Sequence, residues 1–518
     1  MNTDYPRYAG ILMHITSLPS RFGIGDIGKE AYDFVDNLKK TGATLWQILP
    51  LGPTGYGNSP YSPRSSFASN ELLISLEKLY EDGWIKEEEL DNYPALSSDK
   101  VLFDKVIEAK LPLLKKAAER FLEKNENDRK YAEYKKRQKY WIEDYAVFMI
   151  LYEKYADARW YQMWSLKEAK RDKDTIERIK RISHDEMEIW IAMQYFFDMQ
   201  WAELKSYANR RGIRIIGDTP IFVGADSADT WSHIELFKTD KTGAFSSVSG
   251  VPPDNFSSDG QRWGNPVYDW KKHEETDFSW WKERFKRESE RVDILRIDHF
   301  RGFDAYYDIK ASEKTARNGK WIKAPGRKLF SSLKKENECL NIIAEDLGFI
   351  TDSVEKLRKD FSFPGMKISQ FGFTFLPDGE LNTYDTFLPH NYERDFVAYT
   401  GTHDNDTTRG WFSSLSDIER HHVREYLASD DNEIVWALIR AIMLSAADYT
   451  VIPMQDILEL SAEARMNYPS SCNDRNWSWR MKEGAFDEYR VNRMRHLVRI
   501  SGRNGMTAEE MLSKAQDK

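Results

Sequence analysis

Eight short apolar runs, each ending in polar residues, constrain the fold of this chain more than any other feature. They are Gly10–Ile15, Thr44–Leu49, Arg214–Thr219, Ile294–His299, Asn341–Asp346, Lys367–Gly372, Phe396–Thr400 and Thr450–Gln455. Such runs are typical of parallel strands, which helices bury on both faces. Amphipathic stretches of helix length lie between most of them, among them Ile27–Lys40, Ser353–Lys359 and Asp431–Ala447. The alternation predicts an α/β fold, and eight units predict a single (β/α)8 TIM barrel spanning residues 1–518.

Two long segments interrupt this alternation. Residues 62–210, between the second and third runs, are rich in Lys, Glu, Tyr and Trp, and Leu102–Glu123 and Lys139–Tyr155 are amphipathic at the helical period. We expect them to form a mostly helical insertion on the catalytic rim. Residues 222–290, after the third run, are rich in Gly, Pro, Asp and aromatic residues with little periodicity. They predict a loop-rich insertion that serves as an active-site lid.

Charge and cysteine content exclude several classes of partner. The net charge of -9 comes from interspersed acids and bases, without the basic block that binds nucleic acid. Cys339 and Cys472 are too few for a disulfide framework and fit a reducing compartment. The first residues do not resemble a signal peptide, and no run of about 18 apolar residues predicts a membrane span. We therefore expect a cytoplasmic protein with neither nucleic acid nor membrane as partner.

Carboxylates close four of the apolar runs. Asp218, Asp298, Glu345 and Asp404 all lie where a strand should end, and the carboxyl ends of barrel strands carry the functional groups. A single acid there is more often a helix N-cap or a solvated charge. Four together predict a site in which one carboxylate attacks a sugar's anomeric carbon and another transfers the proton.

The neighbours of these acids favour sugar chemistry over metal binding. Arg296 lies two residues before Asp298 and should point to the same side of the strand, where its guanidinium can keep Asp298 ionised. His299, His403 and Asn405 add neutral groups suited to sugar hydroxyls. Asp, Glu and His also ligate divalent ions, but an arginine beside a ligand argues against this alternative. We expect no metal and no organic cofactor.

Two loops allow competing interpretations. The glycine-rich run Gly52–Gly57 lacks the spacing of a phosphate cradle, so we interpret it as a turn that presents Tyr56, Ser59 and Tyr61 to a substrate. The segment 254–260 loosely resembles a calcium loop, yet its twelfth position is Asn265 instead of Glu. We interpret it as part of the lid.

Several motifs resemble those of the 4-alpha-glucanotransferases, the amylomaltases or disproportionating enzymes of the alpha-amylase superfamily. The most specific are Leu295–Gly302, Ile343–Gly348 and Gly401–Thr407. The resemblance also includes Gly10–His14, Leu18–Ser20, Gly52–Tyr61, Val251–Asp254 and Gln261–Pro266. It extends over nearly the whole chain and weakens across the helical insertion.

The resemblance implies a role for each site residue. Asp298 is implied to be the nucleophile, Glu345 the general acid and then base, and Asp404 the third carboxylate, which grips the 2- and 3-hydroxyls of the sugar in subsite -1. The residues implied to surround that sugar are Tyr61, Asp218, Arg296, His403 and Asn467, and we expect His299 to join them as a neutral hydrogen-bonding group. We predict that the lid Val251–Gly260, which includes Asp254 and Phe256, sets the balance between transfer and hydrolysis together with Trp263. Asn255 departs from the family, which has a second aromatic residue there.

The predicted function is 4-alpha-glucanotransferase activity by retaining double displacement. Segments of alpha-1,4-glucans, such as maltooligosaccharides, starch or glycogen, would pass to the 4-hydroxyl of glucose or of another glucan. The nearest competing function is that of an alpha-1,4-glucan hydrolase with the same site. More distant competitors are a glycan-binding scaffold with an inactive site and a metal-dependent barrel lyase.

Overall fold

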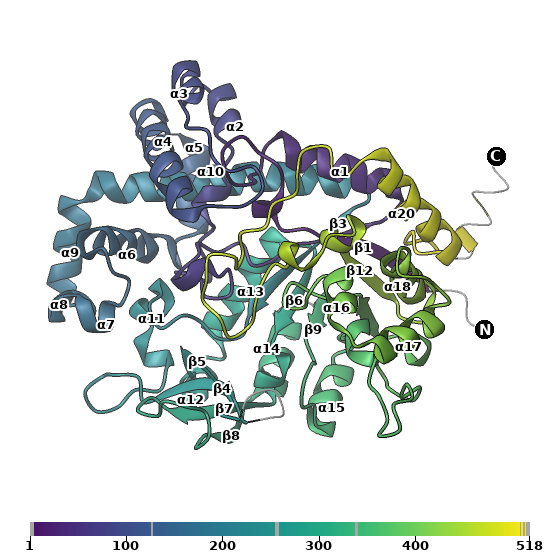
Figure 1. Ribbon diagram of the computed structural model, residues 1–518. Helices are drawn as coiled ribbons and strands as arrows, with labels where there is room; N and C mark the ends of the chain where they lie inside the picture. The colour runs from purple at the N-terminus through teal and green to yellow at the C-terminus, as the bar shows by residue number, and fades with distance from the viewer. Residues whose placement is uncertain are drawn as a thin grey trace.

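The computed structural model describes residues 5–125, 128–253, 258–336, 340–507, 509–510 and 513. Eight parallel strands form one sheet, in the order β10-β11-β12-β1-β2-β3-β6-β9. Figure 1 labels β1, β3, β6, β9 and β12 of this sheet near the centre of the molecule. At the junction of the sheet's two ends, the N–H of Ala344 in β9 donates to the carbonyl oxygen of Pro364, just before β10, at 2.8 Å. The sheet therefore closes on itself, and the predicted (β/α)8 barrel is confirmed.

Each predicted apolar run overlaps one barrel strand. The strands are β1 (Tyr8–Leu12), β2 (Leu45–Gln47), β3 (Arg214–Pro220), β6 (Ile294–Asp298), β9 (Ile342–Ala344), β10 (Gly365–Ile368), β11 (Phe396–Tyr399) and β12 (Tyr449–Pro453). The largest difference is at β10, which begins two residues before the predicted Lys367. It also ends early, because Ser369–Gly372 turn into the 3-10 helix η6.

Helices surround the barrel. They include α1 (Lys29–Thr41), α13 (Ser279–Arg291), α14 (Gly326–Glu336), α15 (Asp352–Asp360), α16 (Thr408–Ser414), α17 (Asp417–Leu427), α18 (Ile434–Leu444) and α20 (Glu488–Ser501). In α1 the buried Phe34, Val35 and Leu38 share one face, and Gly42 ends the helix at a φ of 78° that favours glycine. Between β10 and β11, the helices in the described residues are the short 3-10 helices η6 and η7 (Pro389–Asn391).

Alternation along the strands separates two apolar regions. In β6, Ile294 packs with Ile216 and Val451 in the barrel interior. Its neighbours Leu295 and Ile297 belong to the cluster packed between the sheet and the helices. Arg296 and Asp298 follow Ile294 on the inner side, so β6 presents both side chains within the barrel toward its carboxyl end.

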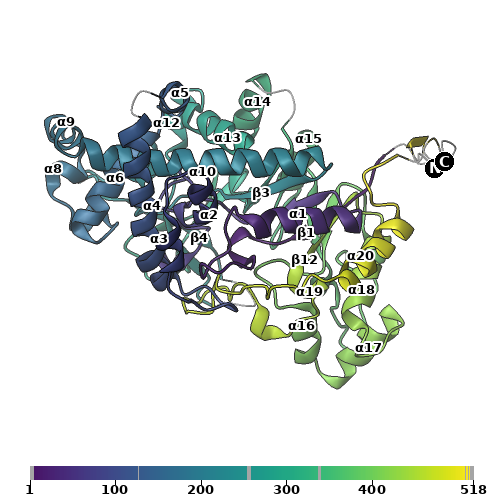
Figure 2. The ribbon, with the colours of Figure 1, turned by 90° about the horizontal axis from the view of Figure 1, so that it is seen from above.

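The segment between β2 and β3 is largely helical. Its helices are α2 (Leu76–Glu81), α3 (Glu87–Asp91), α4 (Phe103–Asn125), α5 (Arg129–Arg137), α6 (Ile142–Tyr155), α7 (Trp160–Met163), α8 (Leu166–Ala169), α9 (Lys173–Ile182) and α10 (His184–Arg210). Figure 2 shows the long α10 running from this group alongside the barrel. None of the helices in the described part of the chain is long and apolar enough to cross a membrane.

A second sheet was not predicted. Four antiparallel strands lie in the order β5-β4-β7-β8, at the bottom of Figure 1. They are β4 (Ser247–Val251), β5 (Gln261–Pro266), β7 (Ala305–Lys310) and β8 (Lys320–Lys323), and α11 (Ala228–Ser232) and α12 (Trp270–Glu275) flank β4 and β5 in the chain. Residues 222–290 thus hold more regular structure than their composition indicates. Glycine, proline and polar residues in β4 and β5 have low strand propensity, which hid these strands.

Candidate active site

Two adjacent strands bring an arginine between two carboxylates. Asp218 of β3 and Arg296 of β6 are register partners. One terminal nitrogen of Arg296, Nη1, donates to both carboxylate oxygens of Asp218 at 2.8 and 2.7 Å. The other, Nη2, lies 3.1 Å from Oδ1 of Asp298. Burial alone would lower the pKa of Arg296, but Asp218 and Asp298 raise it, so the guanidinium stays charged.

Tyr61 joins this group from the loop after β2. Its hydroxyl donates to Oδ2 of Asp218 at 2.7 Å and lies 3.3 Å from Nδ1 of His403. The two rings stack with centroids 4.8 Å apart. Burial, with a smaller contribution from Asp218, raises the pKa of Tyr61, so the hydroxyl remains a donor. The loops after β2 and β11 are thereby fixed on the barrel.

Glu345 follows β9 and is held by backbone donors. The N–H of His299 donates to its Oε2 at 2.7 Å, and the N–H of Leu347 donates to its Oε1 at 2.9 Å. Burial, followed by the charge of Asp298, raises the pKa of Glu345 to about 8. A carboxyl with this pKa carries a proton at neutral pH and suits a general acid.

Burial also raises the pKa of Asp298, while the charge of Arg296 opposes the rise. The side chain of Asp298 is 31% exposed, whereas that of Arg296 is 4% exposed. Asp298 is therefore the accessible member of the ion pair. A substrate atom can reach its carboxylate, which is the geometry a nucleophile needs.

Asp404 lies on the loop after β11 and is 48% exposed at its side chain. The amide nitrogen of Asn467 donates to its Oδ1 at 2.7 Å, and Nε2 of His403 lies 3.4 Å from its Oδ2. The protein thus holds the Asp404 carboxylate in place through Oδ1, while the exposed part of the side chain can contact a ligand.

Arg465 and Asp456 support this loop, and the sequence interpretation missed both. Arg465 donates to the backbone oxygens of Asp404 at 2.5 Å and of Asn467 at 2.7 Å. Buried Asp456 accepts from the side chains of Thr400 and Thr408 at 2.5 and 2.7 Å, and so holds both ends of the loop. A signal for Asp456 was present, because it directly follows the eighth predicted strand. Arg465 contacts backbone atoms, which no side-chain pattern reveals.

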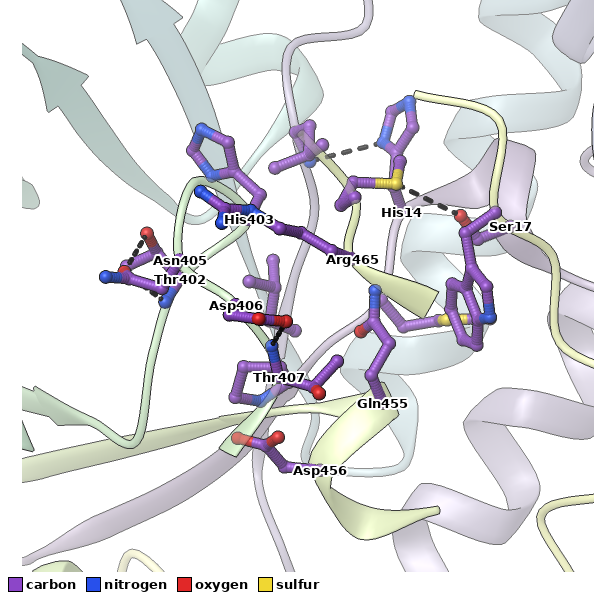
Figure 3. A pocket seen from close by; sticks show the side chains of 16 residues that line it. His14, Ser17, Thr402, His403, Asn405, Asp406, Thr407, Gln455, Asp456 and Arg465 are labelled. Atoms are coloured by element: carbon purple, nitrogen blue, oxygen red, sulfur yellow. Dashed lines mark hydrogen bonds between the residues drawn. The ribbon is translucent and has the colours of Figure 1, made fainter. Parts of the chain in front are cut away.

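A cavity of about 30 Å³ lies behind this loop, at the carboxyl ends of β1 and β12. Its volume suits one or two ordered waters. Figure 3 shows the side chain of Arg465 extending toward His403, with His14 on another side of the cavity. The cavity is too small for a sugar ring, so we assign it to the support of the loop.

His299 and Trp263 lie on the side of the four-stranded sheet. The rings of Trp263, on β5, and His299 meet edge to face with centroids 4.7 Å apart, and the Trp263 residue is 39% exposed. Burial, then the charge of Arg301, lowers the pKa of His299 to about 4, so the imidazole is neutral at pH 7. Its Nε2 is buried and has no hydrogen-bond partner within the described residues.

The remaining predicted residues lie apart from the three carboxylates or outside the described ranges. The hydroxyl of Ser59 accepts from the N–H of Tyr61 at 3.2 Å and shapes the turn that carries Tyr61. Tyr56 lies on the 3-10 helix η2 (Tyr56–Asn58) and is 76% exposed. Asp254 and Phe256, with Asn255, lie outside the described residues.

The site combines a charged pair, a protonated carboxyl and open hydrogen-bonding groups. Among the described residues, no three His, Cys, Asp or Glu side chains are grouped so that they could hold a metal ion. The described arrangement offers an accessible carboxylate for attack, a proton donor nearby, and polar groups for hydroxyls. Retaining glycosidases use the same set of groups.

Comparisons with known proteins agree with this chemistry. A sequence profile described as 4-alpha-glucanotransferase matches residues 13–486. The 4-alpha-glucanotransferase of Synechocystis sp. is 43% identical over 96% of this chain and 98% of its own length. That of Thermus thermophilus is 43% identical over 96% and 100%. The structure of amylomaltase from Streptococcus agalactiae in complex with acarbose superposes with a TM-score of 0.91, at 38% identity over 96% of this chain and 99% of that one.

Proposed function

The chain belongs to the 4-alpha-glucanotransferase family, and we propose that Asp298, Glu345 and Asp404 carry out its transfer reaction. It is an enzyme of transglycosylation that acts on alpha-1,4-glucans. Its relatives are named for transfer, which favours a transferase over a hydrolase with the same site. The observation that supports the residue roles best is the difference in partners: Asp298 pairs with the guanidinium of Arg296, whereas Glu345 is held by backbone N–H groups and has a pKa raised to about 8.

In the first step, a carboxylate oxygen of Asp298 attacks the anomeric carbon of the bound glucan. Glu345 gives its proton to the glycosidic oxygen, so the bond breaks and the reducing-end fragment leaves. The product is a glucan esterified to Asp298. Before the attack, the guanidinium of Arg296 stabilises the negative charge of the Asp298 carboxylate.

In the second step, Glu345 is a carboxylate and takes the proton from the 4-hydroxyl of an acceptor. The acceptor oxygen attacks the anomeric carbon and releases Asp298, which restores the original configuration after two inversions. We propose glucose or another glucan as the acceptor. Asp404 and His403 hold the ring hydroxyls, and Tyr61 packs on the ring, where contacts that strengthen as the ring flattens favour the transition state.

Incubation with maltotriose and isotopically labelled glucose tests this function. We expect a ladder of shorter and longer glucans, with label at the reducing end of the products. Unlabelled glucose and maltose alone would show that water is the acceptor and would support the hydrolase. A cytoplasmic location and the lack of nucleic-acid or membrane partners stay predictions from the sequence.

A further inference from the structure

Three consecutive residues after β6 hold both ends of the loop that carries Glu345. The N–H of His299 donates to the carboxylate of Glu345 at 2.7 Å, and the N–H of Phe300 donates to its backbone oxygen at 3.1 Å. The side chain of Arg301 then reaches the far end of the loop, where Nη1 donates to the backbone oxygen of Phe349. The turn at 299–301 thus clamps residues 345–349.

The guanidinium of Arg301 is itself fixed between two aromatic rings. Its central carbon lies 3.7 Å from the ring centroid of Trp321, on β8, and 5.3 Å from that of Phe349. Arg301 is only 7% exposed, whereas Phe349 is 74% exposed. A planar guanidinium stacked on a tryptophan and bonded to a carbonyl has little freedom. The second sheet therefore supplies a rigid support for the loop.

This support matters because Glu345 must act at one position twice, first on the glycosidic oxygen of the donor and then on the 4-hydroxyl of the acceptor. Its side chain is bonded to Leu347, within the clamped loop, as well as to His299. Gly348, with a φ of 80°, makes the turn between Leu347 and Phe349. Without a fixed Phe349 the turn could relax, and displacement of about 1 Å can cost a large factor in rate.

We propose that Arg301 is a positioning residue for Glu345, which holds the general acid/base in place by fixing the Phe349 carbonyl against the second sheet. Arg301 touches no reacting atom in this account. The proposal rests on the proposed role of Glu345.

Replacement of Arg301 by methionine tests the proposal, because it keeps the apolar stem and removes the guanidinium. With maltotriose, kcat should fall about tenfold, a part of the 10²- to 10⁴-fold that general acid/base catalysis contributes, while KM changes little. First-turnover fluoride release from an alpha-maltosyl fluoride donor should stay near wild type, since fluoride leaves with little help from an acid. Arg211→Met is the matched control, since Arg211 also stacks on a ring, that of Tyr207 at 3.4 Å.

The pH profile separates positioning from a general loss of structure. A released Glu345 meets more water, so its raised pKa should fall and the basic limb of kcat/KM should move to lower pH. Arg301→Lys keeps a charge and a donor without the planar stack, so it should lie between wild type and methionine. Equal losses on both donors, or an unmoved basic limb in both variants, would overturn the proposal. Full activity of Glu345→Gln would instead refute the proposed function.

Discussion

At the scale of single residues, Asp298 and Glu345 need opposite protonation states within one site. In the proposed first step Asp298 must be ionised and Glu345 protonated. Burial and the charge of Asp298 raise the pKa of Glu345 to about 8. Arg296, 3.1 Å from Asp298, opposes the effect of burial there. The ion pair with Arg296 thus favours the ionised form of Asp298.

These shifts predict a bell-shaped pH dependence of kcat/KM for transfer from maltotriose. Glu345 is active as an acid, so activity is present below its raised pKa and is lost as pH rises through about 8. Asp298 is active as a base, so activity falls as pH drops through its pKa, which lies above the ordinary value of 3.8. Initial rates from about pH 4 to 10 measure both limbs. A flat profile across pH 8 would contradict the assignment of Glu345.

Asp298→Asn should abolish transfer while the protein stays folded. The amide keeps the shape of the side chain but cannot attack the anomeric carbon, so we expect a loss of about 10⁴-fold or more. Asp36→Asn is a suitable control, because Asp36 also pairs with an arginine, Arg211, at 2.7 Å. Substantial transfer by a folded Asp298→Asn protein would remove the nucleophile assignment.

At the scale of elements, β5 carries Trp263 to the edge of the site. A glucosyl intermediate meets water at about 55 M, so an acceptor sugar wins only if the enzyme holds it in position and excludes loose water. Trp263→Ala should lower transfer to glucose and increase the hydrolytic share, with little change in melting temperature. A lower melting temperature with an unchanged ratio of transfer to hydrolysis would indicate a packing role. Phe256→Ser should have the same effect if the lid Val251–Gly260 shapes the acceptor subsite.

A buried ion pair attaches α4 to the loop after β1. Lys110 and Asp26 lie 3.1 Å apart, and their side chains are 0% and 3% exposed. Lys110→Met leaves the carboxyl of Asp26 buried without its partner, which should cost about 3–5 kcal/mol of unfolding free energy. Urea denaturation measures the loss. Lys29→Met, at the exposed pair with Asp33, should leave the midpoint nearly unchanged, and equal midpoints for both variants would contradict this account.

The barrel strands could be predicted from the sequence because their burial on both faces requires apolar residues. Buried parallel strands read as apolar runs, and Asp218, Asp298, Glu345 and Asp404 stand at or near their ends. The second sheet was not predicted because β4 and β5 contain glycine, proline and polar residues, and β8 reads Lys-Trp-Ile-Lys, so none of the three shows an apolar run. The roles of Arg465 and Arg301 were not predicted for another reason. Both act on backbone oxygens brought near by the fold, 61 and 48 residues away in the chain.

At the scale of the whole molecule, the barrel receives support for its site from several distant segments. The loop after β2 brings Tyr61, the segment after β12 brings Asn467, and the four-stranded sheet brings Trp263 and the support of Arg301. The three carboxylates themselves stand on or just after the barrel strands β6, β9 and β11. The residues proposed to carry the chemistry thus all stand on or next to the barrel strands.

The most direct test of this account is to trap the intermediate. In the Glu345→Gln variant, an alpha-maltosyl fluoride donor can lose fluoride without help from an acid, but the second step lacks its base, so a maltosyl ester should accumulate. Peptide mass spectrometry of the trapped protein should find the added sugar on Asp298. An adduct on Asp404 would reassign the roles, and rapid turnover with no adduct on any carboxylate would contradict the double-displacement mechanism.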